Sequence, residues 1–275
     1  ALGAARKLGI PVATDFHTNF DAYSGHYGFA WLSRAVAGYL RRFHNRAACT
    51  MVPTDELAAR LSALGFERLR VVGRGVNGAV FNPARRSREL RASWGAGDDD
   101  PVVLCVSRFA PEKNFPLVLE TFRAMQALQP AARLVLVGDG PLLAELRHAS
   151  TGPVIAGMLV NGALSAHYAS ADIFLFPSTT ETFGNVTLEA MASGLAVVAY
   201  DYAAARQYIR HGESGLLAPF DDAAAFVREA RRLAAEPALV DRLRRTARAT
   251  AKQLGWDRIA GDFEQVLQDT ADGAD

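Results

Sequence analysis

The sequence predicts an α/β protein of two domains, each built on a parallel sheet with helices on both faces. Short apolar runs alternate with amphipathic segments along the chain, and this alternation is typical of parallel sheets covered by helices. The length of 275 residues exceeds the usual size of one domain. Turn residues follow several of the apolar runs directly, which predicts ligand-binding loops at the carboxyl ends of the strands.

Nine apolar runs are the candidate strands, because each is four to six residues long and too short for a buried helix. They span residues 11–16, 47–52, 68–72, 102–107, 133–138, 153–157, 172–177, 196–200 and 215–218. Helices are expected where apolar residues recur at helical spacing. These segments are 27–43, 55–64, 115–128, 142–148, 162–169, 185–192 and 223–235, with a final helix from about Trp256.

The domain boundary is expected in the loop 73–78. Three strands precede this loop, too few for a typical domain, and six follow it, enough for a complete doubly wound sheet. We therefore expect residues 1–78 to be the C-terminal part of a first domain and residues 79–252 to be a second, complete one. Residues 253–275 are expected to form a helix that crosses back to the first domain. The chain begins with Ala1 inside a helical pattern, so we expect sequence upstream.

Composition excludes several classes of function. A net charge of +1 argues against nucleic-acid binding driven by charge. Neither Cys49 nor Cys105 belongs to a Cys/His cluster, so no zinc site or disulfide framework is predicted, and a reducing cytoplasmic compartment fits. No apolar run approaches the roughly 18 residues of a membrane span.

Residues 178–192 carry most of the functional information. The turn before the helix 185–192 leaves backbone N–H groups without intrahelical partners, which makes an anion site. Glu181 precedes this turn, and Glu189 lies about one turn into the helix. An anion site flanked by two acids that can bind hydroxyls suits a sugar nucleotide. The residues of the anion site are Phe183, Gly184, Asn185 and Val186.

Each acid has a structural alternative. Glu181 could simply complement the helix macrodipole, and Glu189 could be an ordinary exposed helix residue. A basic pair, Arg108 and Lys113, follows the strand 102–107. Such a pair can stabilise a diphosphate as it becomes a leaving group, although solvated loop side chains are the common alternative.

Five segments in this order resemble glycosyltransferase family 4, the retaining enzymes of the GT-B fold. The likeness is greatest to bacterial members that mannosylate or glucosylate lipids, including phosphatidylinositol. The family's first domain opens with a glycine-rich loop after its first strand, and this chain has no such segment. The five segments are residues 16–19, 107–114, 137–141, 177–192 and 211–217.

The resemblance implies two Rossmann-like domains, an incomplete acceptor-side domain followed by a domain that binds the nucleotide-sugar donor. It also implies a role for each acid, with Glu181 on the sugar hydroxyls and Glu189 on the ribose. Backbone near Met158 would meet the base, and the turn at Gly138 would border the donor cleft, although a capped turn with Pro141 at the first helical position also explains that segment.

His17 follows the strand 11–16 and begins a polar cluster with Thr18 and Asn19. The resemblance places the matching histidine near the donor sugar at the interdomain cleft, where it would hold the sugar or the acceptor and need not be a general base. The alternative is a histidine with a purely structural role.

Three further segments are interpreted as structural rather than functional. The loop 73–78 matches GxGxxG, but no helix pattern follows it, so a dinucleotide site is not predicted. The run Asp98, Asp99 and Asp100 is interpreted as a solvated charge run. The segment 27–46 carries a basic side with a flanking Trp31. It reads as a helix with its apolar face on the core, while peripheral contact with the inner face of the cell membrane is the alternative.

We therefore expect a metal-independent glycosyltransferase that needs no cofactor. It would move a hexose from a GDP-mannose or UDP-glucose type of donor to a hydroxyl acceptor, a lipid or a glycan, with retention. The predicted catalytic residues are Arg108, Lys113, Glu181 and His17. Two other functions stay open, namely a nucleotide-sugar 2-epimerase, which needs no acceptor, and a non-catalytic module that binds nucleotide sugars.

Overall fold

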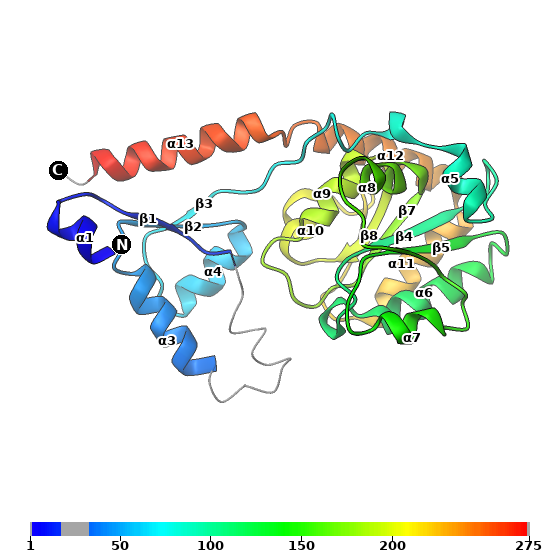
Figure 1. The fold of residues 1–275 in the computed structure, drawn as a ribbon, viewed down its shortest axis with the longest axis horizontal. Coiled ribbons are helices and arrows are strands. Elements are labelled where there is room, and N and C mark those ends of the chain that lie inside the picture. Colours follow the sequence, from blue (N-terminus) through cyan, green and yellow to red (C-terminus); the bar gives the residue numbers. More distant parts are fainter. Residues whose placement is uncertain (1, 18–32, 274–275) are drawn as a thin grey trace. The chain divides into compact units, whose positions relative to one another are not determined.

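The computed structural model describes the chain except residues 1, 18–32 and 274–275 (Figure 1). Thr18, Asn19, Trp31 and the first part of the expected helix 27–43 therefore lie outside the described residues. Contacts divide the chain into two compact units. The first holds residues 1–75, 180–183 and 256–275, and the second holds residues 76–179 and 184–255.

The first unit contains a three-stranded parallel sheet in the order β1-β2-β3. Its strands are β1 (Ala13–Asp15), β2 (Cys49–Val52) and β3 (Leu69–Val71). Among the described residues, the helices of this unit are α1 (Leu2–Lys7), α3 (Ser33–His44), α4 (Asp55–Ala63) and α13 (Trp256–Asp272). α4 begins where the Thr54 hydroxyl accepts a hydrogen bond from the Leu57 N–H at 3.2 Å, a standard N-cap.

The core of the first unit corrects one expectation about α3. The apolar face of the segment 27–46, to which Tyr39 and Phe43 belong, was predicted to lie on the core. Instead Leu40 packs against the core cluster and His44 is buried, whereas Tyr39 is 69% exposed and Phe43 is also exposed. The His44 ring packs against Phe16 and accepts or donates one hydrogen bond with Thr14 at 3.0 Å, and these partners turn the helix toward the sheet.

The final helix, α13, belongs to the first unit although it is last in the sequence. Its start packs tightly against the loop after β3, because a Cβ on Gly75 would lie 2.9 Å from the Cα of Trp256. Near its other end Asp269 forms an ion pair with Arg70 at 3.5 Å. Gly75 is therefore needed for close approach rather than for a dinucleotide loop, and the next structured turn is a 3₁₀ helix at Pro83–Arg85.

The second unit is built on a six-stranded parallel sheet in the order β6-β5-β4-β7-β8-β9. This is a doubly wound order. Strands are added outward from β4 in one direction and then outward from β7 in the other, so the strand order reverses between these two central strands. Each of the nine predicted strands is present with its bounds within two residues of the expectation. The strands of this sheet are β4 (Val102–Val106), β5 (Arg133–Val137), β6 (Val154–Gly157), β7 (Ile173–Phe176), β8 (Ala196–Tyr200) and β9 (Leu216–Ala218).

Helices cover both faces of this sheet (Figure 1). One face carries α6 (Phe115–Gln126), α7 (Leu143–Arg147) and α11 (Ala223–Ala235), and the other carries α8 (Asn161–Ser170), α9 (Asn185–Ala192) and α12 (Pro237–Ala251). Of the α-helices that the structure describes, α5 (Arg88–Ser93), α10 (Ala203–Tyr208) and α12 were not predicted.

The central strands are buried on both faces, as their unbroken apolar sequence indicates. Val103 and Cys105 of β4 point into the cluster formed with α6 and α11. Leu104, between them, is equally buried but is not part of that cluster. With both faces covered, the polar loops at the strand ends are the parts of this unit that remain available to a ligand.

Candidate functional site

The candidate site lies at the carboxyl edge of the six-stranded sheet. The strand order reverses between β4 and β7, which pair in parallel. Ligands of open α/β sheets bind at such a switch point. The loop 107–114 follows β4, and the loop 177–179 follows β7. The fold thus brings the predicted basic pair to the position where a ligand is expected.

Arg108 is held by a buried carboxylate. Its Nη2 donates a 2.6 Å hydrogen bond to Oε1 of Glu112, whose side chain is only 1% exposed. Burial raises the pKa of Glu112, but the Arg108 hydrogen bond and the nearby Lys113 charge outweigh it, so the pKa is lowered overall. Oε2 of Glu112 is buried and has no hydrogen-bond partner among the described residues. The sequence singled out Glu112 only as part of a motif.

Lys113 joins the two loops of the switch point. Its Nζ donates to the Ser178 hydroxyl at 3.4 Å and lies 6.0 Å from the centre of the Phe176 ring. The Thr179 N–H donates to the Glu112 carbonyl at 2.9 Å. These contacts hold the Lys113 ammonium group beside the carboxyl end of β7.

The turn after β5 packs against the Arg108 loop through glycine. Gly138 has φ 141°, and a Cβ there would lie 1.9 Å from the Ser107 carbonyl oxygen. The Phe109 N–H donates to the Asp139 carbonyl at 2.8 Å. The expected role of Pro141 was wrong, because α7 begins at Leu143 and not at the proline. Close approach of two loops is the physical reason for these glycines.

The strand β6 ends at Gly157, whose carbonyl accepts from the Gly138 N–H at 2.8 Å. Met158 follows it and is 73% exposed, so its backbone stands at the edge of this loop group. Contact of this backbone with a base stays a prediction.

The start of α9 has the geometry expected of an anion site. Gly184 is the residue before the helix, with φ 92° and ψ 60°, and no side chain of the described residues is seen to cap the helix. The N–H groups of Asn185 and Val186 therefore have no capping partner in the described part of the chain and can donate to solvent or a ligand. Phe183 is buried and Glu181 is half-buried, and both belong to the first compact unit. The role of Glu181 stays a prediction.

Glu189 is not an ordinary exposed helix residue. Its Oε2 accepts a 2.9 Å hydrogen bond from the hydroxyl of Tyr168, a residue of α8 that is 0% exposed. Burial raises the pKa of Glu189, and the hydrogen bond from Tyr168 partly opposes this. Sequence reasoning missed Tyr168, because only the fold brings α8 and α9 together over β7.

His17 has two partners in the first unit. Its Nε2 lies 2.8 Å from Oδ2 of Asp15, and its Nδ1 contacts the Arg74 guanidinium. The ring is exposed to solvent. The structural alternative for His17 thus has concrete partners, and its contact with a sugar or an acceptor stays a prediction.

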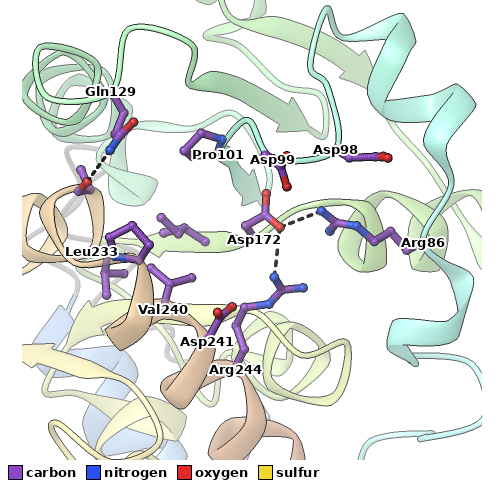
Figure 2. A pocket seen from close by; sticks show the side chains of 13 residues that line it. Arg86, Asp98, Asp99, Pro101, Gln129, Asp172, Leu233, Val240, Asp241 and Arg244 are labelled. Carbon is purple, nitrogen blue, oxygen red and sulfur yellow. Dashed lines mark hydrogen bonds and ion pairs between the residues drawn. The ribbon is translucent and has the colours of Figure 1, made fainter.

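The opposite edge of the six-stranded sheet contains a cavity of about 380 Å³ (Figure 2). Asp172, just before β7, accepts from Arg91 at 3.0 Å and from Arg244 at 3.2 Å. It also pairs with Arg86 at 3.0 Å and accepts from the Val102 N–H at 2.9 Å.

The aspartate run predicted to be solvated is partly ordered at this edge. Asp98 forms an ion pair with Arg88 at 3.2 Å, and Arg91 donates to the carbonyls of Asp98 and Asp100. These contacts close the loop before β4, so this edge is a structural junction.

No group of three or more His, Cys, Asp or Glu side chains in the described part of the chain could hold a metal ion. None of the helices of the described part has the length and apolar character needed to cross a membrane.

Comparison with known proteins assigns this chain to a family. The family model described as "Glycosyl transferases group 1" matches residues 86–250, and that described as "Glycosyltransferase Family 4" matches residues 1–79. The chain is 38% identical to the sulfoquinovosyl transferase SQD2 of Arabidopsis thaliana, over 72% of this chain and 39% of that protein. It is 36% identical to a GDP-mannose-dependent alpha-mannosyltransferase of Mycolicibacterium smegmatis, over 80% of this chain and 57% of that protein.

A third relative is the alpha-monoglucosyldiacylglycerol synthase of Streptococcus pneumoniae, 30% identical over 71% of this chain and 47% of that protein. The chain thus spans about half the length of these relatives.

Solved structures show the same fold. The sucrose-phosphate synthase of Thermosynechococcus elongatus matches with a TM-score of 0.80 at 24% identity, over 97% of this chain and 70% of that one. Anabaena Alr3699/HepE in complex with UDP matches with a TM-score of 0.83 at 20% identity, over 97% of this chain and 74% of that one. This chain belongs to the group 1 family of glycosyl transferases and has the GT-B fold.

Proposed function

We propose that this protein transfers a hexose from a nucleoside-diphosphate sugar to a hydroxyl acceptor with retention of anomeric configuration. The observation that carries the proposal is the paired cation site at the switch point, where Arg108 is held by buried Glu112 and Lys113 by Ser178. Relatives that use GDP-mannose or make a glucosyldiacylglycerol support a nucleotide sugar and a lipid acceptor.

The two cations act on the departing diphosphate. As the bond between the sugar carbon and the phosphate oxygen breaks, negative charge grows on the diphosphate, and fixed cations stabilise that charge without reorganisation. The uncapped first turn of α9 adds N–H donors to the same anion. The new bond to the acceptor oxygen forms on the face that the diphosphate leaves, and the proton of the acceptor hydroxyl passes to the departing diphosphate oxygen. With this charge provided by side chains, the proposed reaction needs neither metal nor cofactor.

The carboxylates bind the neutral parts of the donor. Glu189 accepts hydroxyl hydrogen bonds from the ribose, and Glu181 accepts them from the sugar, because ionised carboxylates make strong and directional bonds of this kind. Backbone at Met158 meets the base. His17, paired with Asp15, holds the sugar or the acceptor.

A lipid acceptor fits the exposed side of α3. Tyr39 and Phe43 are exposed there, and basic residues Arg41 and Arg42 lie in the last turn. Aromatic and basic side chains on one helix favour the surface of an anionic membrane, so we propose peripheral contact with the inner, cytoplasmic face. The test is sedimentation with phosphatidylcholine vesicles with and without phosphatidylglycerol. Binding that survives a Tyr39→Ala, Phe43→Ala double variant would contradict this contact.

The catalytic proposal is tested by substituting the cations. Arg108→Ala and Lys113→Ala should each lower kcat/KM for hexose transfer from UDP-glucose or GDP-mannose about 10²- to 10³-fold. Arg228→Ala is the matched control, because this exposed α11 arginine has only a 3.9 Å ion pair with Glu229. Wild-type kcat/KM in both variants would overturn the assignment. Conversion of the donor without any acceptor would instead indicate an epimerase.

A further inference from the structure

We infer that Tyr168 is a positioning residue, which holds the Glu189 carboxylate in the orientation that accepts the ribose hydroxyls. The inference rests on the proposed function of Glu189 as the ribose-binding acid. It adds a residue that does not touch the ligand and that belongs to a different helix from the acid.

The phenol of Tyr168 is fixed on every side. Its ring is fully buried, with the Phe81 ring edge-on at 5.6 Å between centroids and the Phe174 ring at 5.8 Å. The hydroxyl points at Glu189, where it donates to Oε2 at 2.9 Å. Because the ring cannot move without disturbing β7, the position of the donor is set by the core rather than by the ligand.

The hydrogen bond leaves half of the carboxylate available. An ionised carboxylate has about four acceptor positions on two oxygens, and Tyr168 takes one of them on Oε2. Among the described residues, none is seen to donate to Oε1. A carboxylate that is anchored through one oxygen and open through the other is suited to accept from a vicinal pair of hydroxyls, as in a ribose.

The electrostatics around the pair are simple. Burial raises the pKa of Glu189, and the Tyr168 hydrogen bond opposes this. Tyr168 itself stays protonated, because burial and Glu189 raise its pKa well above 10. Cys105 of β4 stays neutral, since burial raises its pKa to about 12. From α12, Arg248 faces the end of α9 at the Ala192 carbonyl and Arg244 donates to the Gly194 carbonyl just beyond it.

Removing one oxygen atom tests the inference. Tyr168→Phe keeps the ring and its packing but takes away the donor, so Glu189 loses its orientation and protonates at higher pH. Tyr200→Phe is the matched control. Tyr200 is also a buried tyrosine of this unit, but in the described part of the chain its hydroxyl has no hydrogen-bond partner, so its loss should leave binding unchanged.

The measurement is calorimetric titration of the 275-residue chain with UDP or GDP, whichever binds the wild type, and with its 2′,3′-dideoxy counterpart. Titrations run from about pH 5 to about pH 8. We expect Tyr168→Phe to weaken binding of the nucleoside diphosphate about tenfold. The affinity for the dideoxy compound, which lacks the ribose hydroxyls, should change little in this variant. The low-pH limit of binding should move to higher pH in this variant alone.

The outcomes separate the two claims. A wild-type affinity, hydroxyl preference and pH profile in Tyr168→Phe would overturn the inference and leave the proposed function standing. A wild-type chain that binds neither nucleotide would overturn the proposed function, and the ribose assignment with it. If Tyr168→Phe does not fold, 3-fluorotyrosine at position 168 replaces it. This stronger donor should move the low-pH limit downward, and an unmoved limit would overturn the inference.

Discussion

The two edges of the six-stranded sheet use charge in opposite ways. At the amino edge both oxygens of Asp172 are occupied, with three arginines and a backbone N–H around them. At the carboxyl edge the guanidinium of Arg108 binds buried Glu112 but is itself 52% exposed, and among the described residues no side chain caps the start of α9. Buried and saturated charge locks a junction, whereas exposed charge and uncapped N–H groups can bind a ligand. The cavity in Figure 2 therefore belongs to the structural edge.

The largest effect is expected from a substitution that removes the carboxylate at the amino edge. Asp172→Ala leaves the guanidinium of Arg91, 1% exposed, without its carboxylate, and breaking a buried pair in this way costs about 3–5 kcal/mol. Urea unfolding measures this loss. Asp201→Ala, which removes an exposed ion pair with Arg206 at 3.4 Å, should cost less than about 0.5 kcal/mol. Equal losses in the two variants would contradict the distinction between the edges.

The next largest effect is expected from a substitution that disrupts the packing of two loops at the carboxyl edge. Gly138→Ala places a Cβ against the Ser107 carbonyl and forces a strained φ, so it should cost about 2 kcal/mol or more and abolish nucleotide binding. Gly162→Ala is the control, because it lies in α8 with open space around its Cβ position and no positive φ. Unfolding curves and calorimetry of both variants check this. Normal binding by Gly138→Ala would show that the loop contact does not shape the site.

A smaller effect has the opposite sign. Burial raises the folded-state pKa of Glu189 above its ordinary value, so the ionised carboxylate costs stability at neutral pH. Glu189→Gln should therefore stabilise the chain by about 0.5–2 kcal/mol at neutral pH while weakening nucleotide binding. The gain should vanish as pH falls through the folded pKa toward the unfolded one, because the wild-type group then becomes neutral.

Urea unfolding at several pH values measures this gain. Glu264→Gln, exposed on α13, should change stability by less than about 0.5 kcal/mol throughout. A destabilised Glu189→Gln would show that this carboxylate serves the fold rather than a ligand.

The fold was predictable wherever local pattern and packing agree. Residues 196–200 and 223–235 form β8 and α11 with the predicted bounds. A short apolar run between turns is typical of a buried strand, and an apolar face that recurs at helical spacing is typical of a helix. α5 and α10 have only six residues each, too few for a helical period to show. α12 does carry buried Leu239, Leu243 and Ala247 at helical spacing, so its signal was present and was not used.

For the candidate site, the sequence predicts which charged residues lie near the same sheet edge, but it does not predict the partners that hold them. Arg108 and Lys113 follow the end of β4 in the sequence, and Glu189 lies in the helix after β7, so the parallel sheet brings all three to its carboxyl edge. Tyr168 lies 21 residues from Glu189 inside an apolar helix, so nothing local marks its hydroxyl. The burial of Glu112 was hidden for the same reason, because the loop after β7 covers it from 66 residues away.

The central claim is that ligand binding belongs to the carboxyl edge. Hydrogen–deuterium exchange of the wild-type chain, with and without UDP or GDP, tests it directly. We predict that one nucleotide slows exchange in residues 107–114, 138–143 and 184–190. Residues 97–101 and 233–244, which border the cavity at the amino edge, should be unchanged. Protection at the amino edge alone, or no protection with either nucleotide, would contradict the claim.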